Sequence, residues 1–257
     1  MLDQLEQTRI QSIVNPFYKI YVENCVDSTN DQLKLYQAQL KEGTVLIAEQ
    51  QTKGKGRNAR SFHSPSGNGL YFSFLLRPHL KAEQALKICA LASVAVHDSI
   101  YNCYGIHAKI KWVNDLLIQD KKITGILCES IYNQTYIDAM IVGIGINVHS
   151  YEMPDELKNI AGCIEDFSEK IVSRNDLVAE VLNCFYKYYQ NLEKACFMDV
   201  YRQYSYVLNK EIVVDQQDHK FDCIAVDIND DGQLIVKKGE ECIALTTGDI
   251  HIQRKGL

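Results

Sequence analysis

The chain has 257 residues, of which 46% are hydrophobic and 23% charged, which suits one large globular domain or one with a small appendage. Its net charge of −6 argues against a general nucleic-acid binder, because such a protein needs a broad basic face to displace counterions from phosphates. The N-terminus lacks a basic start and an apolar run, and the longest uncharged apolar run is far below the roughly 18–20 residues that span a bilayer, so we expect a cytoplasmic protein without a membrane partner.

Hydrophobic spacing predicts alternating helices and strands in the first part of the chain. Residues 27–40 open with capping residues and continue with apolar side chains at helical spacing, which predicts a helix. Two β-type runs follow at 45–51 and 69–78, and they predict strands on either side of a glycine-containing loop. A long helix is expected over residues 82–103, where apolar side chains share one face.

The centre of the chain, residues 109–148, predicts a meander of antiparallel strands with turns at polar residues. A further helix is expected over 175–194, with Asn175 as its cap. From residue 207 the sequence contains only short β-type runs split by turn signals. The prediction is therefore an α+β protein with a mixed domain at 1–206 and a small barrel-like β domain at 207–257, which would lean on the main domain because it is too small for a generous core.

The nine cysteines are an odd set, and no two of them have a short metal-ligand spacing. Structural zinc sites usually begin with closely paired ligands. Reduced, mostly buried thiols in a cytosolic protein are therefore the favoured interpretation. The histidines are equally dispersed, so a tightly bound metal is not expected.

The first candidate site is the basic loop, residues 53–60, which reads KGKGRNAR. It carries four basic side chains and no acidic one. Glycine lets backbone N–H groups approach an anion, and arginine adds bidentate bonds to phosphate. The spacing is not that of a P-loop, which ends in lysine and serine or threonine. The basic loop is therefore either a solvated surface loop or a segment that closes on an anion.

The second candidate is KWVNDLL at residues 111–117. Trp112 alone would indicate a core residue, and Asn114 with Asp115 could simply form a turn. Strand alternation, however, directs Lys111 away from the side that the tryptophan buries. The segment thus predicts either a structural turn or a cation aimed at a pocket.

Two further segments carry candidate groups. Lys122 enters an apolar strand, so it is either a solvated strand end or a fixed cation at a pocket wall. Gly143 and Gly145 interrupt another strand, which often marks a bulge or a close approach by ligand or backbone, and Asn147 would lie at that opening. No Ser/His/Asp or Cys/His arrangement of a catalytic nucleophile is evident in the sequence.

Together and in this order, these segments resemble the biotin protein ligase family, also called biotin–acetyl-CoA-carboxylase ligase. The family pattern is a serine-threonine-asparagine start, a GRGRxGR loop, KWPNDL, KxxGIL(V/C)E and GIGINV. The corresponding segments here are STN at 28–30, GKGRNAR at 54–60, KWVNDLL at 111–117, KKITGILCE at 121–129 and VGIGINV at 142–148. The resemblance covers about residues 27–148 and, more loosely, the β-type tail. It implies a class II synthetase-like catalytic domain with a small C-terminal β-barrel.

The chemistry that the resemblance implies has two steps. ATP activates the biotin carboxylate to biotinyl-adenylate with release of pyrophosphate, and a lysine of a biotin carboxyl carrier domain then attacks this mixed anhydride to form an amide. Both nucleophiles arrive with the substrates, which accounts for the missing catalytic nucleophile. The enzyme would position groups and stabilise charge, with Mg²⁺ as the counter-ion of ATP.

The resemblance also implies roles for individual residues. Lys122, Arg57 and Arg60 are the expected catalytic cations. Lys122 would offset the negative charge of two groups that must meet, and Arg57 and Arg60 would fold over the activated intermediate with the loop. The expected biotin contacts are Ser28, Thr29, Asn30, Gln51, Gly54, Lys55 and Gly125. The expected ATP contacts are Arg57, Arg60, Phe62, Lys111, Asn114, Asp115 and Asn147, with Asp115 also the candidate ligand of magnesium.

The sequence departs from the family pattern in the basic loop and in the turn before Asn114. Lys55 replaces an arginine, which keeps the charge but loses the bidentate fork. Asn58 removes a further cation, and Ala59 takes a position that is often glycine. Val113 replaces a proline, which leaves that turn less rigid. We interpret these changes as tuning of loop closure and affinity.

Other interpretations stay open at this point. A lipoate–protein ligase or an octanoyltransferase would share the core fold, and a non-catalytic biotin binder would keep the pocket without turnover. Some family members carry an N-terminal helix-turn-helix, for which the stretch before Asp27 is too short, so a monofunctional ligase that does not bind DNA is expected. A homodimer through an edge near residues 142–148 is a further possibility.

Overall fold

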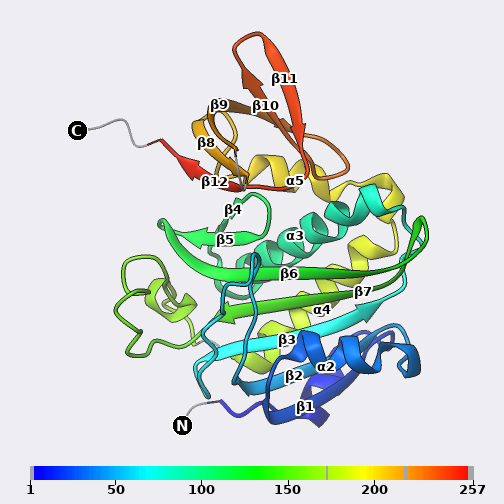
Figure 1. The fold of residues 1–257 in the computed structure, drawn as a ribbon. Helices are drawn as coiled ribbons and strands as arrows, with labels where there is room; N and C mark the ends of the chain where they lie inside the picture. Colours follow the sequence, from blue (N-terminus) through cyan, green and yellow to red (C-terminus); the bar gives the residue numbers. More distant parts are fainter. Residues whose placement is uncertain (1–2, 172, 217–218, 254–257) are drawn as a thin grey trace.

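The computed structural model describes residues 3–171, 173–216 and 219–253 (Figure 1). They form a seven-stranded mixed sheet with packed helices and a separate five-stranded antiparallel sheet at the C-terminal end. The predicted α+β class is confirmed. Among these residues, no helix is both long and apolar enough to cross a membrane.

The element bounds follow the hydrophobic patterns closely in the centre of the chain. The α-helices are α1 Gln7–Ile13, α2 Thr29–Tyr36, α3 Ala85–Tyr104, α4 Arg174–Tyr189 and α5 Phe197–Gln203. The 3₁₀ helices are η1 Gln37–Gln39, η2 Ala82–Gln84, η3 Ile164–Phe167 and η4 Leu192–Lys194. The strands of the large sheet are β1 Lys19–Val26, β2 Thr44–Gln51, β3 Gly69–Leu76, β4 Lys109–Lys111, β5 Asp115–Ile118, β6 Lys121–Asn133 and β7 Tyr136–Asn147. The strands of the small sheet are β8 Glu211–Gln216, β9 His219–Ile228, β10 Leu234–Lys238, β11 Glu241–Leu245 and β12 Asp249–Ile252.

The large sheet has the order β1-β2-β3-β7-β6-β5-β4, in which only β1 and β2 pair in parallel. Strand β3 shows how the two faces differ, because its side chains alternate. Phe74 contacts Phe185 of α4 at a ring distance of 4.7 Å, whereas Leu75 packs with Leu33 of α2. The α3–α4 layer therefore covers one face, and the short helix α2 covers part of the other.

Helix α4 begins one residue earlier than expected, and Asn175 as its cap is wrong. Ser173 is the N-cap, and its Oγ accepts a hydrogen bond from the backbone N–H of Asp176 at 3.3 Å. The Asn175 side chain instead accepts from the backbone N–H of Glu6 and donates to the carbonyl of Gln4, both at 2.8 Å. It was misassigned because serine and asparagine are similarly good caps. The Asn175 side chain, which is not used as a cap, holds the N-terminal segment through these two hydrogen bonds.

The small sheet has the order β11-β10-β9-β8-β12 and shares its core with the large one. Its buried residues Val214 and Ala225 belong to the same apolar cluster as the strands and helices of the main sheet. The buried Trp112 donates from Nε1 to the carbonyl of Gly232 at 2.9 Å. The small sheet thus leans on the main domain, whereas the boundary between residues 206 and 207 stays a prediction.

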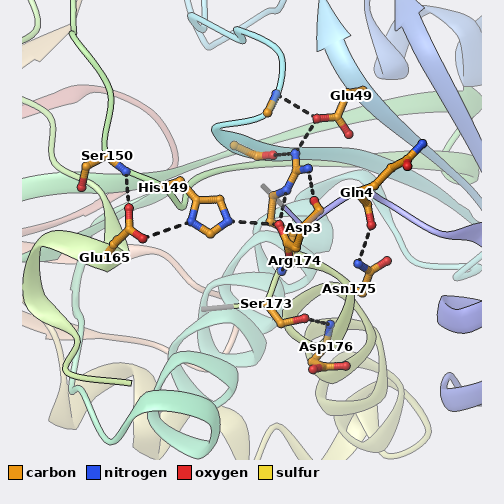
Figure 2. A network of polar contacts seen from close by, with 12 residues as sticks. Asp3, Gln4, Glu49, His149, Ser150, Glu165, Ser173, Arg174, Asn175 and Asp176 are labelled. Atoms are coloured by element: carbon orange, nitrogen blue, oxygen red, sulfur yellow. Dashed lines mark hydrogen bonds and ion pairs between the residues drawn. The ribbon is translucent and has the colours of Figure 1, made fainter. Parts of the chain in front are cut away.

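A polar network around Arg174 joins segments that are distant in sequence (Figure 2). Arg174 is 1% exposed, and its Nε donates to Asp3 at 2.9 Å, while its Nη1 donates to Glu49 at 2.8 Å and to the carbonyl of Gly69 at 3.1 Å. A buried charge is tolerated only when it is paired and hydrogen-bonded. The network therefore fixes the end of β2 and the start of β3 against α4.

His149 extends this network after β7 (Figure 2). Its ring contacts Asp3 at 3.0 Å on one side and Glu165 at 3.4 Å on the other. The hydrogen bond to Asp3 raises the pKa of His149 above its ordinary value, burial opposes this shift, and Glu165 reinforces it. Burial raises the pKa of Asp3, but hydrogen bonds from His149 and Arg174 outweigh burial and hold that pKa below its usual value.

The His149 contacts predict a pH-dependent contribution to stability. A histidine whose pKa is raised on folding stabilises fully below its unfolded pKa of about 6.5 and loses that contribution as pH rises through the folded pKa. We expect the difference in unfolding free energy between wild type and His149→Gln to shrink as pH rises from about 6 to about 9. Urea unfolding followed by Trp112 fluorescence measures it, with the exposed His219→Gln as control. A pH-independent difference for His149→Gln would contradict the assignment.

Candidate functional site

A cavity of about 170 Å³ opens on the α2 face of the large sheet, between α2, the strands β5 to β7, the basic loop and the start of β12. It brings together most of the site residues expected from the sequence, which are Ser28, Thr29, Asn30, Gln51, Lys55, Arg57, Arg60, Phe62, Lys111, Asn114, Asp115, Lys122 and Gly125. Four stretches of the sequence, 28–30, 51–62, 111–115 and 122–125, thus converge on one site.

Two expected residues lie just outside the cavity lining. Gly54 is buried in the base of the basic loop, where a side chain would collide with the carbonyl of Phe62, so its glycine is explained by packing of the loop itself. Asn147 is also buried, and its Nδ2 lies 3.5 Å from the carbonyl of Lys122. Asn147 therefore contacts the backbone of β6 at Lys122.

The floor of the cavity contains glycines on two adjacent strands, β6 and β7. Gly143 lies between Ser73 on β3 and Leu127 on β6, and Gly145 lies between Tyr71 and Gly125. A side chain at Gly143 would overlap the carboxamide of Asn30, and one at Gly145 would meet the ring of Phe62 at 2.6 Å. The glycines thus leave room for the side chains of Asn30 and Phe62. The sequence alone could not indicate this contact.

One end of the cavity is uncharged and rich in hydrogen-bonding groups. Ser28 and Thr29, at the start of α2, are 1% and 3% exposed. The backbone N–H of Thr29 donates to Gln51 Oε1 at 2.9 Å, and Gln51 Nε2 donates to Ser64 Oγ at 3.0 Å. The Asn30 amide is engaged within the protein, where it donates to Glu129 and accepts from Ser73. This end suits a neutral ligand group with paired donors and acceptors.

The other end of the cavity is cationic. Lys122 Nζ lies 2.7 Å from Asp115 Oδ1, an ion pair without hydrogen-bond geometry. Lys111 lines the same region, half-exposed at the end of β4. The basic side chains on the cavity wall outnumber the acidic ones, and they are Lys55, Arg57, Arg60, Lys111 and Lys122 against Asp115 and Asp249. This end therefore favours an anion.

The basic loop folds as a small hairpin over the cavity. Lys55 pairs with Ser61 in an antiparallel bridge, and the backbone N–H of Phe62 donates to the carbonyl of Gly54 at 2.8 Å. At the tip, Asn58 and Ala59 adopt positive φ angles of 53° and 57°. Asparagine tolerates this conformation better than alanine, and glycine tolerates it best. The alanine at position 59 therefore stiffens the tip at some cost in strain.

The three cations that the basic loop contributes to the cavity wall are already paired with protein groups. Lys55 Nζ lies 2.6 Å from Asp31 of α2, and this hydrogen bond raises the pKa of Lys55. Arg57 donates to Asn114 Oδ1 at 3.2 Å and to the carbonyl of Gly248 at 3.5 Å. Arg60 pairs with Asp249 at 2.5 Å. Any anion that enters must therefore exchange with these partners.

The small sheet also contributes to this site, although its sequence contains no indication of this. Gly248, Asp249, Ile250 and His251, at and before β12, line the cavity. A short β-type segment with one acidic residue carries no local signal of a binding site. Only the tertiary contact with the basic loop, close to 190 residues away in sequence, shows it.

The site does not form a resident metal centre from the residues that the structure describes. No group of three histidine, cysteine, aspartate or glutamate side chains among them is arranged to hold a metal ion. Asp115 lines the cationic end of the cavity, and it is already paired with Lys122. Its role as a magnesium ligand stays a prediction.

Comparison with known proteins agrees with this geometry. The sequence model of the biotin/lipoate A/B protein ligase family matches residues 22–147. The bifunctional ligase/repressor BirA of Bacillus spizizenii is 34% identical over 216 residues, which are 82% of this chain and 66% of that protein. The biotin–[acetyl-CoA-carboxylase] ligase of Mycobacterium tuberculosis is 27% identical and is covered over 79% of its length, by 81% of this chain.

A solved structure extends the similarity to the fold. The biotin protein ligase of Aquifex aeolicus, in complex with biotin and ATP, superposes with a TM-score of 0.79 at 28% identity and covers 93% of this chain and 100% of its own. The chain therefore belongs to the biotin/lipoate A/B protein ligase family and, within it, to the biotin protein ligases. It spans just under two thirds of the first of these relatives.

The pairing of Arg60 with Asp249 predicts that the small sheet restrains the basic loop. Because the Arg60 side chain is 68% exposed, the pair contributes at most about 1 kcal/mol. We expect Asp249→Asn to speed tryptic cleavage within residues 53–60 roughly two- to fivefold without substrates. Glu240→Gln, which breaks the exposed pair with Lys237 at the turn between β10 and β11 of the same sheet, is the control. Equal cleavage rates for wild type and Asp249→Asn would disprove the restraint.

Proposed function

We propose that this protein is an ATP-dependent biotin protein ligase that activates biotin to biotinyl-adenylate and transfers biotin to a lysine of a biotin carboxyl carrier domain. One observation carries the proposal, namely a single cavity with an uncharged hydrogen-bonding end at Thr29 and Gln51 and a cationic end at Lys122 and the basic loop. Biotin has the matching halves, a neutral ureido head and a carboxylate tail. The Aquifex aeolicus ligase, described with biotin and ATP, supports the same ligands here.

The uncharged end discriminates between the ligands that the family name covers. Ser28, Thr29 and Gln51 are buried or half-buried polar groups on this wall. A site built to hydrogen-bond its substrate rejects an analogue that leaves buried polar groups unpaired. The dithiolane ring of lipoate has no N–H or carbonyl to pair with them. The wall therefore favours biotin over lipoate.

The cationic end supports the first chemical step. The biotin carboxylate must attack the α-phosphorus of ATP, and both groups are negative. The Lys122 ammonium lies on the β6 side of the cavity floor and Arg57 and Arg60 lie above it, so they would offset the charge that gathers as the new P–O bond forms and pyrophosphate leaves. Such preorganised charge is often the largest contribution to catalysis. Lys111 and Asn114 would bind the nucleotide, with Asp115 holding Lys122 in place.

The second step needs shielding as well as charge. The mixed anhydride must survive in water until the amine of the carrier lysine attacks its carbonyl carbon and AMP leaves. The basic loop and Phe62, which packs on Gly125 and Gly145, would cover the intermediate and exclude water. Magnesium would arrive with ATP and take most of its ligands from the triphosphate, and Asp115 is the candidate for one further oxygen.

Biotin-dependent exchange of labelled pyrophosphate into ATP tests the proposed function, and the Lys122→Ala variant tests its mechanism. We expect the exchange rate to fall on the order of 10²–10³-fold in this variant, because a cation at the reacting groups is lost. Lys121→Ala is the matched control, since the neighbouring ammonium bonds to the carbonyl of Lys158 away from the cavity. Wild type that exchanges with lipoate but not with biotin would refute the assignment, and undiminished exchange by Lys122→Ala would remove that residue from the mechanism.

Arg57→Ala tests whether the basic loop retains the intermediate. Loss of the contacts with Asn114 and Gly248 should loosen the loop, so that biotinyl-adenylate escapes and labels bystander lysines. We expect biotinylation of added serum albumin to rise several-fold, while Lys53→Ala, at the exposed start of the loop, behaves as wild type. Labelling confined to the carrier domain would show that Arg57 has no retaining role.

A further inference from the structure

A row of four oxygen atoms lies beside the uncharged end of the cavity, from α2 across β3 to the end of β2. Asn30 Oδ1 lies 2.6 Å from Ser73 Oγ, Ser73 Oγ lies 2.7 Å from Thr29 Oγ1, and Thr29 Oγ1 lies 3.1 Å from Gln51 Oε1. Ser73 is fully buried, and Asn30 and Thr29 are nearly so. The protons of the two hydroxyls can therefore be counted from their protein partners, whereas Gln51, at the other end of the row, is half-buried and lines the cavity.

Both ends of the row are fixed as acceptors. The Asn30 Nδ2 group donates to Glu129 at 2.9 Å and faces the carbonyl of Leu127 at 3.3 Å. Because a carboxylate and a carbonyl only accept, the amide nitrogen must face them, and the oxygen must face Ser73. Burial raises the pKa of Glu129, but hydrogen bonds from Lys34 and Asn30 outweigh burial and keep that pKa low, so this acceptor is charged at neutral pH.

The opposite end is fixed in the same way. The backbone N–H of Thr29 can only donate, and it bonds to Gln51 Oε1 at 2.9 Å. The Gln51 Nε2 group donates to Ser64 Oγ, and the Ser64 hydroxyl donates in turn to the carbonyl of Phe62. Gln51 therefore presents oxygen to the Thr29 hydroxyl.

The row then has three contacts but only two hydroxyl protons, one on Ser73 and one on Thr29. Asn30 Oδ1 has no other donor among the described residues, so the Ser73 proton goes there, since a buried acceptor left unpaired is costly. Thr29 Oγ1 is also placed to donate to Gln51 Oε1 at 3.1 Å, but its one proton goes to Ser73 at 2.7 Å, because two acceptors that face each other without a proton repel more strongly at the shorter distance. The contact between Thr29 and Gln51 is left without a proton, and two acceptor atoms face each other beside the cavity.

From this count we infer that Ser73 and Asn30 are specificity-determining positioning residues, which make the Thr29–Gln51 end of the cavity require a ligand N–H group. The inference rests on the proposed function and deepens it. A ureido N–H placed near the two oxygens supplies the missing proton, whereas a ligand with an oxygen at that point adds a third acceptor. Ser73 does not line the cavity, so it acts through Thr29.

The test compares biotin with its cyclic carbonate analogue, in which oxygen replaces both ureido N–H groups at nearly constant shape. In Ser73→Ala, the Thr29 proton is free to satisfy Gln51 or to face the ligand, so the site no longer lacks a proton. We expect the ratio of the two dissociation constants, analogue over biotin, to fall about tenfold in this variant, the equivalent of about one hydrogen bond. Titration calorimetry on the full chain measures both constants.

A second variant and a control separate this effect from general loosening. Asn30→Leu has a similar shape and releases the Ser73 proton toward Thr29, so it should lower the ratio as Ser73→Ala does. Ser99→Ala removes another fully buried hydroxyl, which bonds to a carbonyl within α3, and should leave the ratio unchanged. An unchanged ratio in both Ser73→Ala and Asn30→Leu, with wild type binding biotin, would overturn the inference. Failure of wild type to bind biotin would instead overturn the proposed function.

Discussion

The site depends on the absence of side chains at three glycines of the large sheet. Gly125, Gly143 and Gly145 lie in adjacent cross-strand rows on the α2 face. Any side chain at Gly143 would displace Asn30, and one at Gly145 would displace Phe62. With those two groups moved, neither the hydrogen-bonded wall nor the cover of the cavity would keep its place. The missing side chains of these glycines thus hold in place both the hydrogen-bonding wall and the aromatic cover of the cavity.

The same geometry accounts for cations concentrated on a flexible segment of an acidic protein. Each cation that the basic loop contributes to the cavity wall has a protein partner, supplied by α2, by the turn before β5 or by β12. The Lys55 and Arg60 side chains are 48% and 68% exposed, so their ion pairs are weak. A phosphate with higher charge density can replace those partners at little cost. In the proposed mechanism, the loop would therefore hold the adenylate and still reopen.

Sequence patterns predicted the elements of the catalytic part well, because apolar periodicity is a local property. The resemblance to the family also predicted most of the residues that meet at the cavity. It rests on the order of the motifs, which composition alone does not give. One failure has a physical cause. Asn175 and Ser173 are interchangeable as caps by type, and only the packing of the N-terminal segment distinguishes them. Asn30 lines the cavity as expected, and its amide also bonds to Ser73 and Glu129, which the sequence could not indicate.

The contribution of the small sheet could not be predicted, because it is a property of how the two sheets meet. Trp112 was expected to pack in the core, and it does so by bonding to Gly232 of the small sheet. This contact anchors the chain just before Asn114 and Asp115, while Asp249 reaches the basic loop from the same sheet. One sheet therefore positions both the turn that carries Asn114 and Asp115, the proposed nucleotide contacts, and the basic loop. A displacement of the small sheet would alter both at once, so it belongs to the site rather than to the periphery of the molecule.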